Sequence, residues 1–320
     1  MSNLANDLTA GGRRRPETAD MAAPLIAGVE LGGTKGVALV ARGNRILRRI
    51  RVPTGRPRET LQALSDQIAA WGDDLGPVAA LGVASFGPLG LDATRRDFGF
   101  ITRTTKPHWS QTDVLGHFRA RFAVPAGFDT DVAGAALAES LWGAGVGHKV
   151  VVYVTVGTGV GGGVVIDGRP VHGRVHPEIG HLRIRRAPDD FFSGVCAFHG
   201  DCLEGLASGP AIAARAGAPA ETLAADHPVW PDVADALAEM AVSLILTLSP
   251  QRILLGGGVL AGKPFLFPMI REATRRRLGG YVAGLTPSLL TRMVRPPGLG
   301  DRAGPLGAVA LGVRAMANPA

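Results

Sequence analysis

Cysteines, aromatic residues and long apolar runs are all scarce in this sequence of 320 residues. Two cysteines are too few for the disulfide framework of a small secreted protein. No apolar run reaches the roughly 18 residues that a membrane span needs. The net charge is +7, but aromatic residues are only 5% of the chain, and none is interleaved with the arginine clusters as in nucleic-acid surfaces. We therefore expect a cytoplasmic globular protein that binds neither membrane nor nucleic acid, with a surface suited to anionic substrates.

The beginning of the chain, MSNLANDLTAGGRRRPETAD, lacks the apolar centre of a secretion signal. We expect residues 1–24 to form a disordered basic tail. The length of the chain exceeds what one hydrophobic core usually serves, which indicates two lobes.

The remaining sequence alternates between strand and helix patterns. LIAGVELGGTKGVALV and VVVYVTVGTGVGGGVVI each read as strand, turn and strand. Their turn residues Thr34 and Thr158 lie 124 residues apart. Residues 58–71 have helical spacing, with apolar side chains on one face. The repeated hairpin predicts two related lobes with a cleft between them, although chance similarity of two glycine-rich hairpins is an alternative.

Glycine-rich turns after strands let backbone N–H groups approach a phosphate, so each such turn is a candidate phosphate-binding loop. Residues 157–162, GTGVGG, match the dinucleotide pattern, but a strand-like VVIDG follows where that pattern requires a helix. Residues 257–263 nearly match a P-loop, but Pro264 follows and has neither a hydroxyl nor an N–H group. Both sites are therefore rejected.

What remains is a phosphate-binding device made of two hairpin turns. Thr34 and Thr158 each place a hydroxyl at a turn, and Lys35 adds a cation. Two plain β-turns that need glycine would give the same pattern. Taken together with the GGG turn after Leu255, the paired hairpins resemble the phosphate grips of the actin-like, hexokinase-like ATPase fold.

A series of motifs then resembles the ROK family of bacterial sugar kinases and related repressors, in the order of that family and over nearly the whole chain. The TTKPHW and HPEIGH segments, GDRAGPLGA and a glutamate at position 30 are similar to the fructokinase branch in particular. The matching segments are ELGGTK (30–35), FGPLG (86–90), TTKPHW (104–109), DTDVAGAALAE (129–139), VTVGTGVGGG (154–163), HPEIGH (176–181), CAFHGDCLEGLASGPA (196–211) and LSPQRILLGGGV (248–259).

The resemblance implies that ATP, with Mg²⁺, binds between the lobes and that Asp131 is the catalytic base. A helix N-cap role is the alternative for Asp131, and Asp129 and Thr130 qualify for it equally. The sugar would contact Gly87, Pro88, Glu178 and His181. The nucleotide would be bound by three turns: Gly32, Gly33, Thr34 and Lys35; Gly157, Thr158 and Gly159; and Gly256, Gly257 and Gly258.

The same resemblance implies a structural zinc held by His181, Cys196, His199 and Cys202. Two thiolates and two imidazoles form the usual closed tetrahedral set for such a site. A cytosolic chain has no reason to join these cysteines in a disulfide. The alternative is two free thiols beside two solvated histidines.

The fold expected from these features is a two-lobed actin-like, hexokinase-like α/β ATPase fold, with duplicated ribonuclease H-like lobes and a central cleft. We assign residues 25–128 to an N-terminal lobe and 129–300 to a C-terminal lobe with the zinc-binding loop. Residues 301–320 would form a helix that returns toward the N-terminal lobe. Resemblance to the family also implies a homodimer.

The function expected is ATP-dependent phosphorylation of a hexose at the 6-hydroxyl, converting D-fructose to fructose 6-phosphate. Two departures leave the sugar open: Ala133 stands where the family usually has asparagine, and Arg103 and Thr104 replace an asparagine before TKPHW. Glucose or mannose is therefore the first alternative. A transcriptional repressor or a sugar sensor without activity is the second, although too few residues precede the first strand for a helix-turn-helix domain.

Overall fold

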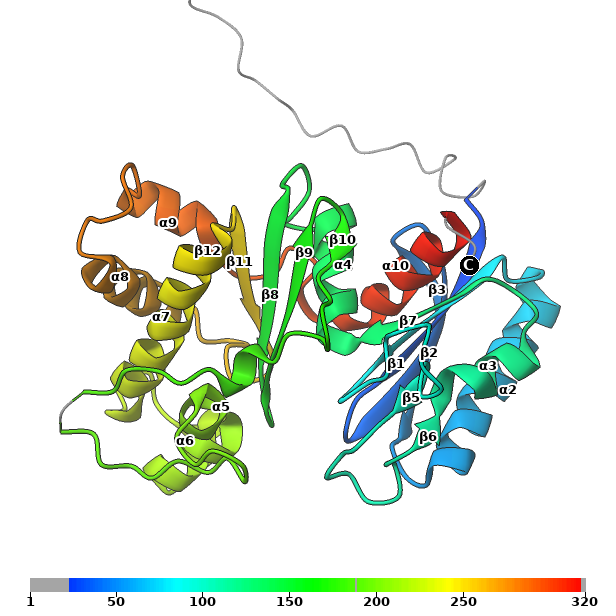
Figure 1. Ribbon diagram of the computed structural model, residues 1–320, viewed down its shortest axis with the longest axis horizontal. Helices are drawn as coiled ribbons and strands as arrows, with labels where there is room; N and C mark the ends of the chain where they lie inside the picture. The colour runs from blue at the N-terminus through cyan, green and yellow to red at the C-terminus, as the bar shows by residue number, and fades with distance from the viewer. Residues whose placement is uncertain (1–22, 188, 318–320) are drawn as a thin grey trace, which may run out of the picture.

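Two five-stranded sheets organise the protein in the computed structural model, which describes residues 23–187 and 189–317 (Figure 1). The strand order of the first sheet is β3-β2-β1-β4-β7. Antiparallel pairing joins β1, β2 and β3, whereas β4 and β7 run parallel to β1. Its strands are β1 (Leu25–Leu31), β2 (Lys35–Arg42), β3 (Arg45–Pro53), β4 (Ala80–Ser85) and β7 (Ala126–Thr130).

The second sheet repeats this pattern strand for strand, in the order β10-β9-β8-β11-β12. Again a three-stranded antiparallel meander is followed by two parallel strands. The predicted duplication of two related lobes is therefore confirmed. The strands are β8 (Val150–Val156), β9 (Val160–Ile166), β10 (Arg169–Pro170), β11 (Arg252–Gly256) and β12 (Val294–Arg295).

Helices cover both faces of each sheet, which explains why the central strands are apolar at almost every position. On the outer face of the first sheet lie α2 (Pro57–Leu75) and α3 (Val114–Arg121). The expected apolar face of residues 58–71 is the one that α2 buries. A small ribbon of β5 (Phe100–Ile101) and β6 (Thr112–Asp113) precedes α3.

The outer face of the second sheet is covered by the longest helix, α7, and its neighbours. Alternate residues of β8 divide between the two sides: Val152 and Val154 face this core, whereas Val151 and Tyr153 face the interior between the sheets. The helices are α5 (Leu203–Ala207), α6 (Gly209–Ala216), α7 (Val229–Leu248), α8 (Leu266–Leu278) and α9 (Pro287–Met293).

Two helices, α4 (Asp131–Trp142) and α10 (Ala303–Ala317), lie side by side between the two sheets (Figure 1). Helix α10 packs mainly on the first sheet and α4 mainly on β8 and β9 of the second. The two helices meet at glycines, because a Cβ atom added to Gly307 would lie 2.5 Å from the carbonyl carbon of Gly134. Only residues without side chains allow the backbones to approach so closely.

A buried glutamate closes the far end of this helix pair. Glu139 is fully buried in α4, and its carboxylate accepts hydrogen bonds from the N–H groups of Ala144, Gly298 and Leu299 at 2.7–2.9 Å. Because the last two residues lead into α10, this one carboxylate joins the end of α4 to the start of the returning segment.

Among the described residues, no helix combines the length and the apolar character that crossing a bilayer requires. The basic tail expected for residues 1–24 falls almost entirely outside the described residues. The lobe boundaries expected at residues 128 and 300 stay predictions.

Replacing Gly307 with alanine should destabilise the protein by about 1–3 kcal/mol, because the new methyl group meets the backbone of α4. Gly72, in α2, is the matched control because a Cβ atom there would meet nothing within 4 Å. Gly72→Ala should instead stabilise by about 0.5–1 kcal/mol through the higher helix propensity of alanine. Urea unfolding followed by circular dichroism measures both, and equal stabilisation by the two substitutions would contradict the close crossing.

Candidate active site

A cleft of about 810 Å³ is lined by residues of both lobes. The first lobe contributes the β1–β2 turn, the segment after β4 and residues 103–105. The second contributes the β8–β9 hairpin and residues 176–181. Of the residues predicted to bind substrates, the cleft brings together Gly32, Gly33, Thr34, Lys35, Gly87, Pro88, Asp131, Gly157, Thr158, Gly159, Glu178 and His181.

Both hairpin turns leave their backbone open to the cleft. A Cβ atom at Gly33 or Gly157 would meet nothing within 4 Å. The β8–β9 turn is closed by the Gly157 N–H, which donates to the carbonyl of Gly159 at 2.8 Å. Next to it the Glu204 carboxylate accepts from the Val160 N–H at 3.0 Å. The strand β9 follows this turn directly, which confirms that it is not a dinucleotide-binding loop.

The third predicted turn, Gly256 to Gly258, is not among the residues that line the cleft. It follows β11 and packs against the end of β8, where the Val259 N–H donates to the carbonyl of Val156 at 2.9 Å. Gly257 has a φ of 92°, a conformation that favours glycine. This turn therefore lies beside the β8–β9 hairpin, outside the main cleft.

Asp131 is the first residue of α4, and the structure separates it from the capping role. The cap is Thr130, whose hydroxyl accepts from the Ala133 N–H at 3.1 Å. The neighbouring Asp129 is buried and lies 3.0 Å from His172. Within the described part of the chain, the Asp131 carboxylate accepts only local bonds, from its own backbone N–H and from the Val132 N–H at 2.9 Å. Its carboxylate is thus available to a ligand in the cleft.

Two carboxyl groups in the site have raised pKa values. Burial raises the pKa of Asp131 to about 6; the bond from Val132 opposes this shift and the charge of Glu178 adds to it. Burial and then the charge of Asp131 raise the pKa of Glu30 to about 7, although Lys35 lowers it. The sequence pattern places Glu30 in the ELGGTK motif but predicts no role for its carboxylate. The available signal was a lone carboxylate at the end of a buried strand, directly before a Gly-Gly turn.

The other end of the cleft is built from polar groups near Pro88 and Glu178. The side chain of Glu178 is half exposed, and its Oε1 atom lies 3.4 Å from Nδ1 of His176. Trp109 of the TTKPHW segment is fully buried and donates to the Gly55 carbonyl at 2.9 Å, which anchors the loop that presents Arg103. Of the two departures from the family pattern, Arg103 therefore lines the cleft, whereas Ala133 is buried within α4.

The four residues predicted to bind a metal converge beside the cleft. The ligand atoms of His181, Cys196, His199 and Cys202 all lie within 4.8 Å of one another. Nδ1 of His181 is 3.5 Å from the Cys202 sulfur and 3.8 Å from the Cys196 sulfur, and Nδ1 of His199 is 3.8 Å from the latter. Tetrahedral zinc with usual bond lengths places sulfur and nitrogen ligands about 3.5 Å apart, so the donor set fits this metal.

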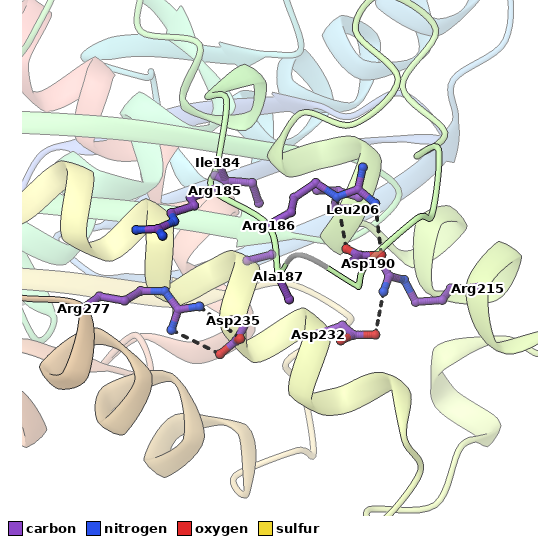
Figure 2. Close-up of a pocket in the computed structure, with 11 residues that line it drawn as sticks. Ile184, Arg185, Arg186, Ala187, Asp190, Leu206, Arg215, Asp232, Asp235 and Arg277 are labelled. Carbon is purple, nitrogen blue, oxygen red and sulfur yellow. Dashed lines mark hydrogen bonds and ion pairs between the residues drawn. The ribbon is translucent and has the colours of Figure 1, made fainter.

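Ion pairs hold the segment that carries these ligands against the second lobe (Figure 2). Asp190 receives Arg186 of the same segment and Arg215 of α6, both at 3.0 Å, and Arg215 also contacts Asp232 of α7. Burial alone would raise the pKa of Asp190, but the bonds from both arginines bring it down to about 2. The side chains surround a cavity of only about 30 Å³, so they act as a clamp and leave no room for a substrate.

Comparisons with known proteins support the same family. The model of the ROK family matches residues 26–315. A fructokinase from Zymomonas mobilis subsp. mobilis is 44% identical over 299 residues, which cover 90% of this chain and 96% of the relative. The ROK hexokinase from Thermus thermophilus superposes with a TM-score of 0.75 at 29% identity, over 92% of this chain and 99% of that one.

A second solved structure holds ligands. It is the ROK family glucokinase from Streptomyces griseus in complex with glucose and AMPPNP, with a TM-score of 0.70 and 25% identity. The alignment covers 91% of this chain and 99% of that one. With these matches, the predicted two-lobed actin-like fold is confirmed.

Replacing Asp131 with asparagine should stabilise the protein at pH 8 and change its stability by less than about 1 kcal/mol near pH 4. The folded pKa of about 6 exceeds the ordinary value of 3.8. Ionisation therefore costs the folded state free energy above pH 6, and this cost disappears once the carboxyl is protonated in both states. Relief of up to about 3 kcal/mol should develop between pH 4 and pH 6 and then level off.

Urea unfolding across this pH range measures the effect, with Asp73→Asn as the control at an exposed carboxylate of α2. A loss of stability in Asp131→Asn at pH 8 would mean that the carboxylate holds the fold together.

Proposed function

The chain belongs to the ROK family and is an ATP-dependent hexose kinase, and we propose that it phosphorylates D-fructose at the 6-hydroxyl, with Asp131 as the catalytic base. The observation that carries the choice of fructose is the 44% identity to a fructokinase over 96% of that relative's length. The observation that supports the base is the free carboxylate of Asp131 at the start of α4, within the cleft.

Proton transfer is the task that suits Asp131. A base must be ionised at working pH and lie within hydrogen-bond reach of the attacking hydroxyl. A pKa of about 6 leaves the carboxylate ionised at neutral pH and makes it more basic than an ordinary aspartate. The Val132 N–H holds Oδ1, which leaves Oδ2 for the sugar hydroxyl. The base accepts that proton while the hydroxyl oxygen attacks the γ-phosphorus and ADP departs.

Binding of the triphosphate would fall to the two hairpin turns. Their open backbone N–H groups and the hydroxyls of Thr34 and Thr158 suit phosphate oxygens, and Lys35 supplies a cation. Mg²⁺ that arrives with ATP would neutralise part of the phosphate charge. Glu30, at the end of β1 before the first turn, is not one of the residues that line the cleft, but it lies close enough to Asp131 and Lys35 for their charges to shift its pKa. The turn at Gly256 to Gly258 would lie toward the adenosine.

Sugar binding would use the opposite end of the cleft. The half-exposed carboxylate of Glu178 suits two vicinal hydroxyls, because one carboxylate accepts two hydrogen bonds at once. Gly87 and Pro88 line the facing wall, and His181 lies between sugar and metal ligands. Closure of the lobes over both substrates would exclude water, which otherwise competes with the hydroxyl for the γ-phosphate.

Zinc would be held by His181, Cys196, His199 and Cys202, and its role would be structural. His181 follows Glu178 by three residues, and Cys202 lies at the start of α5, which carries Glu204. One ion would therefore pin both the sugar-binding loop and the carboxylate that supports the β8–β9 turn. The homodimer and the cytoplasmic location expected from the sequence stay predictions.

Cys202→Ala should lose zinc and lower the midpoint of thermal unfolding, because three ligands no longer close the site. Metal content of the purified protein, measured by plasma mass spectrometry, tests this directly. His108→Ala, which removes an exposed histidine, should keep one zinc per chain. Unchanged zinc in the Cys202 variant would remove this cysteine from the site.

Release of ADP from ATP and Mg²⁺ should depend on fructose and should fall by about 10²- to 10⁴-fold in kcat for Asp131→Asn. The assay compares fructose, mannose, glucose, N-acetylmannosamine and no sugar, with Asp73→Asn as the matched control.

Turnover of another hexose alone would keep the kinase and point to Arg103 as a determinant of specificity. Binding of a sugar without any turnover would instead identify a sensor, and full activity of Asp131→Asn would rule out this residue as the base.

A further inference from the structure

His176 connects the two lobes across the sugar end of the cleft. The side chain is buried, with only 7% of its surface exposed. Its Nε2 atom accepts a hydrogen bond from the Leu89 N–H at 3.2 Å, and its Nδ1 atom lies 3.4 Å from Oε1 of Glu178. Leu89 follows Gly87 and Pro88 in the first lobe, whereas His176 and Glu178 belong to the second. One imidazole therefore contacts both walls of the proposed sugar site.

The backbone donor determines which nitrogen of His176 carries the proton. A backbone N–H group only donates, so the Nε2 atom that faces Leu89 must present its lone pair. A neutral imidazole then has its proton on Nδ1, the nitrogen that faces Glu178. Within the described chain, Nδ1 meets hydrogen-bond geometry with the Pro177 carbonyl at 3.5 Å, and the Oε1 atom of Glu178 lies 3.4 Å from the same nitrogen. The Nδ1–H group thus faces two acceptors, the Pro177 carbonyl and the Glu178 carboxylate.

The cleft wall at Gly87 packs closely against the imidazole of His176. A Cβ atom at Gly87 would lie 3.2 Å from Nε2 of His176, which is tighter than an ordinary contact. The backbone at Gly87 therefore packs directly against the imidazole ring of His176. Both the hydrogen bond to Leu89 and this close approach hold the ring in one orientation.

We propose that His176 is a positioning residue for the sugar: it holds Glu178 by Oε1, leaves Oε2 for the sugar hydroxyls, and sets the distance between Glu178 and the Pro88 wall. This inference rests on the proposed function, since it assigns Glu178 to the sugar. His176 itself does not contact the reacting atoms. Its loss therefore weakens sugar binding and leaves the binding of ATP and the chemical step nearly intact.

The kinetic test compares two substitutions of His176. Leucine fills the space but neither accepts nor donates, so His176→Leu should raise KM for fructose about tenfold, as expected for one lost hydrogen-bond relay. KM for ATP and kcat should change less than about threefold. A glutamine amide offers an acceptor and a donor with the same one-atom separation as the imidazole nitrogens. His176→Gln should therefore restore most of the affinity for fructose.

A double-mutant cycle shows whether His176 acts through Glu178. In a Glu178→Ala background, adding His176→Leu should raise KM for fructose by less than about twofold, because its target is already missing. If the double variant instead raised KM for fructose by the product of the two single-variant factors, the two residues would act independently and the proposal would be overturned. An unchanged KM in His176→Leu, or equal losses in the leucine and glutamine variants, would also overturn it.

The protonation state gives a readout that needs no activity. Nitrogen-15 NMR of the imidazole in the wild-type protein without substrates should report the proton of His176 on Nδ1, and a proton on Nε2 would overturn the proposal even if His176→Leu fails to fold. A wild-type protein that turns over no hexose would refute the proposed function, and the positioning role with it. An active wild type with an insensitive His176→Leu would refute only the positioning role.

Discussion

The close crossing of α4 and α10 at Gly134 and Gly307 is the constraint on which the rest of the structure depends. Each helix packs on a different sheet, so their contact sets where the two lobes stand relative to each other. It also sets the position of Asp131, because this residue begins α4, one turn before Gly134. A bulkier residue at the crossing would push the lobes apart and move the base from the cleft. Packing at this one point thus decides the geometry of the chemistry.

The second organising feature is the segment from about residue 171 to residue 205, which has little regular structure of its own. This segment is held by its Cys and His metal-ligand cluster, by ion pairs and by a buried imidazole, and only to a small extent by the backbone hydrogen bonds of helices or strands. The Cys and His donors hold its middle, Asp190 fastens it to α6 through Arg215, and His176 fastens its beginning to the first lobe. Since Glu178 and Glu204 both belong to this segment, these contacts help to place both carboxylates at the wall of the cleft.

Electrostatics in the cleft follow from placing several carboxyl groups near one another, two of them with raised pKa values. In addition to burial, the charge of Asp131 raises the pKa of Glu30, and the charge of Glu178 raises the pKa of Asp131. Such an arrangement costs stability in the empty protein. It suits a site that receives cations with its substrate and that needs a carboxylate basic enough to accept a proton from a hydroxyl.

Local sequence patterns predict most of the secondary structure of this protein. The two hairpins, the apolar face of α2 and the alternation of strands and helices follow from spacing, because side-chain periodicity is a property of neighbouring residues. The ordered series of motifs was enough to name the family and to nominate Asp131, Glu178 and the four metal ligands. The roles of those residues stay predictions, but their positions in the cleft or directly beside it agree with the pattern that suggested them.

Only the tertiary structure determines the properties that depend on contacts between residues far apart in the sequence or on the orientation of one side chain. Three adjacent residues, Asp129, Thr130 and Asp131, are equally suitable N-caps in the sequence. The structure shows that Thr130 is the cap, because its hydroxyl accepts from the Ala133 N–H. The raised pKa values of Glu30 and Asp131 require burial and mutual proximity, which no spacing reveals. The contact of His176 with Leu89 joins residues 87 positions apart. Sequence determined which elements form and which chemistry they carry, whereas packing of the two lobes determined which of those groups meet.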